Sequence, residues 1–277
     1  MKINTLTTLT VAGIFAAGSA SAAIIFSENF NGITAGTGIT DSNTNYTDFF
    51  NGTGNSQTAT ADTGYIFGEG TSNIFNRSLD NSGSESARIN ANDLGGGDLA
   101  TYSWDFNDSS LTTAGGFAFR LSTVNDAQSD FSVQINFRTD TREIIDNDNE
   151  TDYAANATYQ LDTVANTGGS IVNYTDGYGD SQSLDADSFS VYLTNLDRTL
   201  QTLVIENRAF NGAETGAGFD SISFQTFNGA DGIDVAWDNV VVDDTLTVTV
   251  VPEPSTYALL FGVLTLGLVV LRRRLRN

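Results

Sequence analysis

The chain has 277 residues, with 34 acidic and 12 basic side chains, no cysteine and no histidine. Disulfides, thiol catalysis, Cys/His zinc sites and Ser-His-Asp or Cys-His nucleophiles are therefore excluded, because the residue types are missing. Any chemistry must come from carboxylates, hydroxyls, amides or aromatic rings. The length is ample for a sizeable hydrophobic core, so the fold needs no covalent or metal staple.

The first 22 residues have the organisation of an export signal. Lys2 gives a positive start, residues 6–17 are uncharged and apolar apart from threonines, and Ala20, Ser21 and Ala22 are small. This is the pattern that signal peptidase recognises. We predict an N-terminal signal helix over residues 1–22, cleaved after Ala22 by signal peptidase. A short buried helix is the alternative.

A second apolar segment lies near the end of the chain. Residues 257–271 carry no charge, and arginines follow at 272, 273, 274 and 276. At about 1.5 Å per residue this helix spans roughly 23 Å, so Ser255 and Thr256 are needed to approach the ~30 Å of a bilayer core. We predict a transmembrane helix over residues 255–271 that tethers the protein to the inner membrane. Positive charge stays on the cytoplasmic side, which places the preceding domain outside.

The only prolines of the chain, Pro252 and Pro254, bracket Glu253 directly before this helix. Proline fixes φ and disfavours a helical residue before it, so this strip should be extended and accessible to an enzyme. The tail has the sequence VPEPST at residues 251–256, followed by the predicted apolar helix and then by the arginine cluster. This order resembles the PEP-CTERM sorting signal of Gram-negative bacteria. An ordinary C-terminal stop-transfer anchor is the alternative.

The resemblance implies a partner and a destination. In that family an exosortase, a membrane-embedded cysteine protease or transpeptidase, reads the motif, here Pro252, Glu253 and Pro254. It then passes the protein to the cell surface or the extracellular polysaccharide matrix of a biofilm. We therefore divide the chain into a signal peptide (1–22), a body (23–250) and a sorting segment (251–277).

The body is strongly acidic. The signal peptide contains Lys2, and the sorting segment contains Glu253 and four arginines. Without these two segments the body has 33 acidic residues and seven arginines, a net charge of −26. A nucleic-acid partner is excluded, because neutralising phosphates requires clustered Lys and Arg. The same charge favours solubility and offers carboxylates to divalent cations outside the cell.

Hydrophobic residues of the body recur with a period of two. Phe117, Phe119 and Leu121 alternate with polar or small residues, and the run from Phe131 to Phe137 does the same. This period places the apolar set on one face of a strand. Gly, Asn, Asp, Ser and Thr clusters separate the runs, as in turns. We predict an all-β fold, an antiparallel β-sandwich. Further runs of this kind are Tyr102-Trp104-Phe106, Phe189-Val191-Leu193, Ile222-Phe224, Ile233-Val235-Trp237 and Leu246-Val248-Val250.

The two ends of the body resemble the first and last strands of jelly-roll domains of the concanavalin A-like or carbohydrate-binding-module type. The matching stretches are residues 24–32 (IIFSENFNG) and 235–242 (VAWDNVVV). The resemblance implies a jelly roll whose terminal strands lie side by side and whose concave face often holds glycan. Trp104, Trp237 and the tyrosines are expected mainly in the core, with stacking on sugar rings as the alternative.

Two sets of carboxylates are candidate calcium ligands. Glu28 has the phase of Phe26, and Asp238 that of Val240, so each should face an apolar side unless its strand has a bulge. If the terminal strands pair, Glu28 and Asp238 can share a structural Ca²⁺, which resembles the calcium sites of jelly-roll modules. The alternatives are backbone N–H groups, an arginine such as Arg120, or water at a strand end.

The second set comprises Asp146, Asp148, Glu150 and Asp152, with carboxylates at every second position. A curling loop with this spacing turns its oxygens toward one hard cation. The string resembles the start of an EF-hand loop but has Thr151 in place of the glycine at the sixth position and Ala157 in place of the acid at the twelfth. A solvated loop is the alternative.

The body is expected to be a non-enzymatic glycan-binding or structural component of the polysaccharide matrix. A glycoside hydrolase acting on polysaccharide is the runner-up, because two carboxylates suffice for that chemistry. Laminarinase-type enzymes on a similar fold carry Glu-x-Asp-x-x-Glu on one strand. Here Glu143 and Asp146 are three residues apart, which puts them on opposite faces of a strand, so the pattern fails. A protein-binding adhesin or structural subunit is the third possibility.

Overall fold

The computed structural model describes residues 24–28, 49–51, 59–62, 72–76, 88–91, 94, 97–110, 115–123, 131–146, 149–211, 218–227, 234–246 and 248. Within these ranges every regular element is a strand, and all strand pairs are antiparallel. None of them contains a helix that is long and apolar enough to cross a membrane. The predicted signal helix (1–22) and transmembrane helix (255–271) lie outside the described residues.

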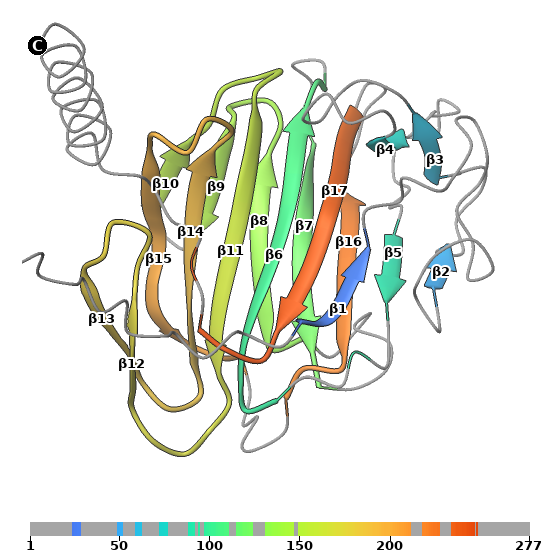
Figure 1. Cartoon of the computed structure of the whole chain (residues 1–277). Coiled ribbons are helices and arrows are strands. Elements are labelled where there is room, and N and C mark those ends of the chain that lie inside the picture. The colour runs from blue at the N-terminus through green and yellow to red at the C-terminus, as the bar shows by residue number, and fades with distance from the viewer. Residues whose placement is uncertain are drawn as a thin grey trace, which may run out of the picture.

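Two sheets pack face to face, as Figure 1 shows, and a small third sheet lies beside them. We name the larger two the front and back sheets from their positions in Figure 1. The predicted antiparallel β-sandwich of jelly-roll type is confirmed. The front sheet orders its strands β15 (Gln201–Ala209), β14 (Ser188–Asn195), β11 (Thr158–Asn166), β6 (Leu99–Asp108), β17 (Asp234–Asp243), β4 (Ser72–Asn76) and β3 (Ala59–Asp62), with β1 (Ile24–Glu28) also paired to β17. The back sheet orders β10 (Asn149–Asp152), β9 (Glu143–Asp146), β8 (Val133–Arg138), β7 (Gly116–Ser122), β16 (Ser221–Phe227), β5 (Arg88–Ala91) and β2 (Phe49–Asn51).

Alternate residues of the strands meet between the two sheets and form the core. Trp104 of β6 is central: its ring centroid lies 5.4 Å from that of Phe119 on β7 and 5.1 Å from that of Phe224 on β16. Such aromatic pairs contribute about 0.5–1.5 kcal/mol each beyond the area they bury. Trp104 and Trp237 are 1% and 4% exposed, which confirms their expected place in the core. Other aromatic members of this core are Tyr102, Phe106, Phe117, Phe137, Tyr153, Phe189, Phe210 and Phe219.

The first and last of the described strands lie side by side, as the resemblance to jelly rolls implied. Phe26 of β1 pairs with Val242 of β17, and Glu28 pairs with Val240. On the same edge of β17, Ile74 of β4 pairs with Ala236. Strand β17 therefore joins β1 and β4 to the rest of the front sheet.

A buried ion pair links the two sheets at one end of the sandwich. Arg142, in the turn between β8 and β9, donates from its guanidinium to the Asp108 carboxylate and to the carbonyl oxygen of Ser110. Tyr153 Oη donates to Asp108 Oδ2 at 2.7 Å, and the Ser110 backbone N–H donates to Asp108 Oδ1 at 3.0 Å. The side chain of Asp108 is fully buried and that of Arg142 is 12% exposed. We name Asp108, Arg142 and Tyr153 the polar clamp.

A second, smaller core lies on the outer face of the front sheet. The hairpin of β12 (Val172–Thr175) and β13 (Ser181–Leu184), at the lower left of Figure 1, follows β11 and precedes β14. Leu246 and Val248, which the sequence placed in a strand, are in no strand and pack here instead. The complete set is Val164, Tyr174, Leu184, Tyr192 and Val248, with Val172, Leu203 and Leu246 at its margin, and we name it the outer cluster.

Candidate functional site

The outer face of the back sheet is a ladder of uncharged polar side chains and arginine. Strand β7 lies between β8 and β16, so each of its residues has a cross-strand neighbour on both sides. One row aligns Gln134, Arg120 and Ser223, and the next aligns Asn136, Ala118 and Gln225. The intervening residues of these strands point into the core, because side chains alternate along a strand. We name the two rows the polar face.

Hydrogen bonds organise one side of the polar face. Arg120 Nε donates to Gln134 Oε1 at 3.1 Å, and Gln134 Nε2 donates to Asn136 Oδ1 at 2.5 Å. The Arg120 guanidinium carbon lies 4.4 Å from the ring centroid of Phe131, in cation–π contact. These contacts hold a half-buried guanidinium, two amides and an aromatic ring on one surface.

The other side of the polar face contains acceptors without a protein partner. Ser223 is 0% exposed, and its Oγ makes no hydrogen bond; Gln225 Oε1 is buried and also unpaired. More than nine in ten buried polar groups in proteins are paired, and these two are among nine buried side-chain atoms of the described residues without a partner, which lie in both sheets and in the turns. A hydroxyl group both donates and accepts hydrogen bonds, so it can pair with either of them.

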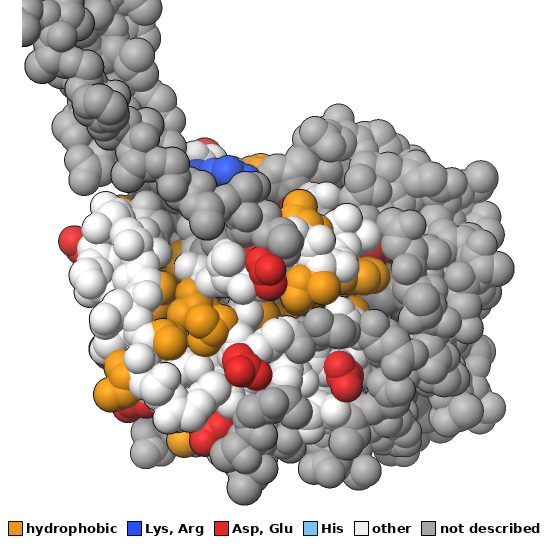
Figure 2. Space-filling view, turned by 60° about the horizontal axis from the view of Figure 1, so that its bottom comes forward, with side chains coloured by type: hydrophobic (Ala, Val, Ile, Leu, Met, Phe, Trp, Pro, Cys, Tyr) orange, Lys and Arg blue, Asp and Glu red, His pale blue; other side chains and the backbone are white. Residues whose placement is uncertain are grey.

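The polar face differs in charge from the rest of the body. Among the described side chains of β7, β8 and β16, no carboxylate occupies an outward position. Acids appear at the margin, where Arg138 Nη1 lies 3.9 Å from Glu143 Oε2 and 3.7 Å from Glu150 Oε1. At the end of the sandwich seen in Figure 2, acidic side chains stand as separate spots among polar and apolar ones. The polar face is thus a nearly neutral surface on a strongly acidic protein.

The predicted cation pair, Glu28 and Asp238, is divided between the faces of the front sheet. The terminal strands pair as the prediction required, and Glu28 is opposite Val240 on the core side. A β-bulge between Asp238 and Val241, with Asn239 at φ 50°, shifts the register of β17. Asp238 therefore lies opposite Asp105 on the outer side, away from the face of Val240. The bulge overturns the expected common face of Asp238 and Val240.

Asp105, which sequence reasoning did not single out, is the acid that Asp238 faces. Both side chains are 5% exposed, and Asn239 Nδ2 donates to Asp105 Oδ2 at 2.7 Å. Burial raises the pKa of the Asp105 carboxyl to about 7; the bond from Asn239 lowers it, and the nearby charges of Asp238 and Asp162 raise it. The pairing of Asp105 with Asp238 has no signal in the sequence, because a bulge and a long-range register create it.

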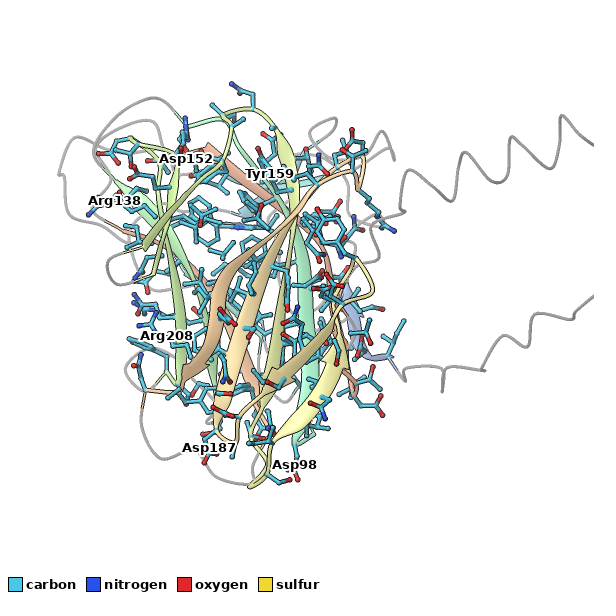
Figure 3. The ribbon with its side chains drawn as sticks, turned by 90° about the vertical axis from the view of Figure 1, so that its left-hand side faces the viewer. Asp98, Arg138, Asp152, Tyr159, Asp187 and Arg208 are labelled. Atoms are coloured by element: carbon cyan, nitrogen blue, oxygen red, sulfur yellow. The ribbon has the colours of Figure 1, made fainter. Side chains whose placement is uncertain are left out.

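The second predicted set of ligands forms a β-hairpin instead of a curling loop. Strands β9 and β10 pair Asp146 with Asn149 and Glu143 with Asp152. Glu150 and Asp152 share one face of β10, and Glu150 is in the ion pair with Arg138 described above. Figure 3 shows Asp152 and Arg138 at the same end of the sandwich, away from Asp98 and Asp187. Asp148 and the side chain of Asp146 lie outside the described residues.

The calcium sites stay a prediction, and melting the purified protein tests it. Among the described residues, no group of three or more acidic side chains is arranged to hold a metal ion. If either predicted set binds Ca²⁺, the melting midpoint rises with millimolar Ca²⁺ and falls with chelator, because a ligand that binds only the folded state stabilises it. An equal midpoint in both solutions would remove both sets.

Comparison with known proteins identifies the C-terminal tail. The fold defines a two-sheet antiparallel sandwich, and residues 250–274 match the PEP-CTERM protein-sorting motif. This match confirms the resemblance that VPEPST carried and marks an exported protein with a C-terminal sorting tail. The motif residues Pro252, Glu253 and Pro254 fall within the match and outside the described residues. No curated protein matches this chain in sequence.

Several solved structures share the arrangement of the body at low similarity. Lectin II from Ulex europaeus aligns with 12% identity and a TM-score of 0.47, covering 81% of this chain and 100% of the lectin. Domain 4 of AbnA, a GH43 extracellular arabinanase from Geobacillus stearothermophilus in complex with arabinotriose, aligns with 13% identity and a TM-score of 0.41, covering 82% and 95%. A glycoside hydrolase family 131 catalytic domain from Coprinopsis cinerea aligns with 11% identity and a TM-score of 0.41, covering 70% of this chain and 80% of that domain's chain. Likeness at this level assigns neither ligand nor activity.

Proposed function

We propose that this protein is an exported, non-enzymatic component of the cell surface or extracellular polysaccharide matrix, and that its polar face binds glycan. The sorting tail supports the destination. The observation that carries the ligand class is the half-buried Arg120 guanidinium beside the amides of Gln134 and Asn136. Ser223 Oγ has no protein partner but is 0% exposed, so a sugar reaches it only after a rearrangement. Sugars present dense hydroxyl groups, which pair with such donors and acceptors, and their C–H faces suit an aromatic ring such as Phe131.

The substitution Ser223→Ala tests this function. Because Ser223 Oγ has no protein partner, removing it should leave the melting midpoint unchanged. Binding to the purified extracellular polysaccharide of the producing bacterium should weaken about threefold to tenfold, the effect of one lost hydrogen bond. Affinity electrophoresis or pull-down with that polysaccharide measures the change.

A matched control is Gln160→Ala, on the outer face of the front sheet, which should leave binding unchanged, whereas Gln225→Ala on the polar face should weaken it. Equal binding by Ser223→Ala, Gln225→Ala and the unmodified protein would contradict the proposed site. Assembly of the protein without any affinity for the polysaccharide would instead identify a protein-binding structural subunit.

A polysaccharide hydrolase is the second candidate function, and the environment of Asp105 favours it. A carboxyl with a pKa of about 7 beside a second carboxyl is the arrangement of a general acid and its partner in glycosidases. Both Asp105 and Asp238 are 5% exposed, so a substrate would reach them only after a rearrangement. Release of reducing ends from the polysaccharide, abolished by Asp105→Asn, would establish this function in place of the first.

A further inference from the structure

The chain does not leave the body where β17 ends at Asp243. Thr245 donates to Asp243 Oδ1 from its backbone N–H at 3.0 Å and from Oγ1 at 2.9 Å. Thr101 Oγ1, on β6, donates to the carbonyl oxygen of Thr245 at 2.6 Å. These bonds turn the segment after β17 and hold it on the outer face of the front sheet.

Leu246 and Val248 then contribute to the outer cluster. Val248 is 3% exposed and packs with Val164 of β11 and Tyr192 of β14, which form the floor. The β12–β13 hairpin forms the roof with Tyr174 and Leu184. A 2.6 Å hydrogen bond between the hydroxyls of Tyr174 and Tyr192 joins roof to floor. Leu246 and Val248 are therefore held in a cluster to which both the hairpin and the sheet contribute, and we name this packing the clasp.

The sorting motif begins almost at once after this clasp. The match starts at residue 250, and Pro252 is four residues after Val248. An extended chain covers at most ~3.6 Å per residue, so the four-residue step from Val248 to Pro252 can span at most about 14 Å. This maximum span is only slightly longer than the 10–12 Å diameter of one helix with its side chains. An enzyme that encloses the motif would collide with the folded body while Val248 remains in place.

We propose that the outer cluster restrains the sorting tail, and that the exosortase acts on the form in which Leu246 and Val248 have left the clasp. Local openings of this kind occur without global unfolding, and cleavage follows the population of the open form when opening is fast. The packing of Val248 then sets the rate of trimming. This inference depends on the sorting motif and is independent of glycan binding by the polar face.

The test is pulse-chase of the full-length chain in cells that contain the native exosortase, with the mass of the mature product as readout. Val248→Ala weakens the clasp and should raise the trimming rate at least fivefold. Inserting eight Gly and Ser residues after Val248 frees the motif without opening the clasp and should raise the rate similarly. In the inserted chain, Val248→Ala should add nothing, because the restraint is already relieved.

Val133→Ala is the matched control, because Val133 is fully buried in the main core, far along the chain from the tail. It should leave the trimming rate within twofold of the unmodified protein. In purified protein, hydrogen exchange around Thr245 should accelerate in Val248→Ala and not in Val133→Ala. Unchanged or slower trimming in both Val248→Ala and the inserted chain, or equal acceleration by Val133→Ala, would overturn the proposal. Polysaccharide binding by the trimmed product reports separately on the polar face.

Discussion

Replacing Arg142 with methionine should lower the free energy of unfolding by about 3–5 kcal/mol, the cost of removing one partner from a buried ion pair. Asp108 would keep a fully buried carboxylate with only Tyr153 Oη and the Ser110 N–H as donors. Domains of this size are stable by only about 5–15 kcal/mol, so the loss is a large fraction of the total. Urea unfolding measures it as a lower midpoint at constant slope.

The polar clamp also holds backbone in place. Arg142 has φ 64°, in the left-handed region that non-glycine residues rarely adopt. Its N–H donates to Arg138 O at 3.0 Å, and its carbonyl accepts from the Tyr153 N–H at 2.8 Å. The guanidinium contacts therefore stabilise a turn that its own backbone disfavours. Asp108→Asn should destabilise the protein as well, and the double variant by less than the sum, because both act on one network.

Arg138→Met is the control for this prediction. Arg138 is also an arginine of the β8–β9 region, but its side chain is 50% exposed and its ion pairs are 3.9 and 3.7 Å long. Exposed pairs of this kind contribute about 0–1 kcal/mol. Similar urea midpoints for Arg142→Met and Arg138→Met would contradict the role of the polar clamp.

Asp105→Asn should stabilise the protein at pH 8, by an amount on the order of 2–4 kcal/mol. Asparagine keeps an oxygen to accept the hydrogen bond from Asn239 and removes a buried charge that faces Asp238. The groups whose charge acts on Asp105 are Asp238 of β17, Asp162 of β11 and Arg198 of the β14–β15 turn. The two acids raise the pKa of the carboxyl and the arginine lowers it.

The same group fixes the direction of the pH dependence. The pKa of Asp105 rises from 3.8 in the unfolded chain to about 7 in the fold, so the folded state binds more protons between these values. Stability from this group is greatest below pH 4 and declines as the pH rises through about 7. In chelator, the melting midpoint of the unmodified protein should therefore fall between pH 5 and pH 8, with a smaller fall in Asp105→Asn.

Asp140→Asn is the matched control, because Asp140 is exposed in the turn between β8 and β9. It removes the same charge from the surface and should leave the pH dependence unchanged. If Asp105→Asn and the unmodified protein lose the same amount of stability between pH 5 and pH 8, Asp105 does not titrate in this range.

The alternating hydrophobic runs predicted many of the inner strands but not β11 of the front sheet, because only a strand with a clear two-residue alternation carries this signal in the sequence. Strands β6, β7, β8, β14 and β16 all follow this pattern. Strands β12 and β13 are short and mostly polar, and their stability comes from Tyr174 and Leu184 packing on the front sheet. Such strands form through tertiary contacts, and local sequence does not predict them.

The candidate site was largely beyond sequence reasoning for the same reason. Gln134, Arg120 and Ser223 come from three strands, and only the register of β7 with its neighbours brings them into one row. The predicted carboxylates show that register can also separate residues that the sequence pattern brings together. One bulge at Asn239 places Asp238 on the outer face of the front sheet, away from Glu28. The sorting motif was predictable because its residues are contiguous and their order along the chain carries the signal.

The pairing of β1 with β17 has a consequence for how the protein is made. Among the described strands, β17 is the last to be synthesised, and both β1 and β4 depend on it for their place in the front sheet. Contacts between such distant parts of a chain form late. Until β17 emerges from the ribosome, β1 and β4 have no partner that joins them to β6, so the front sheet can be completed only at the end of synthesis.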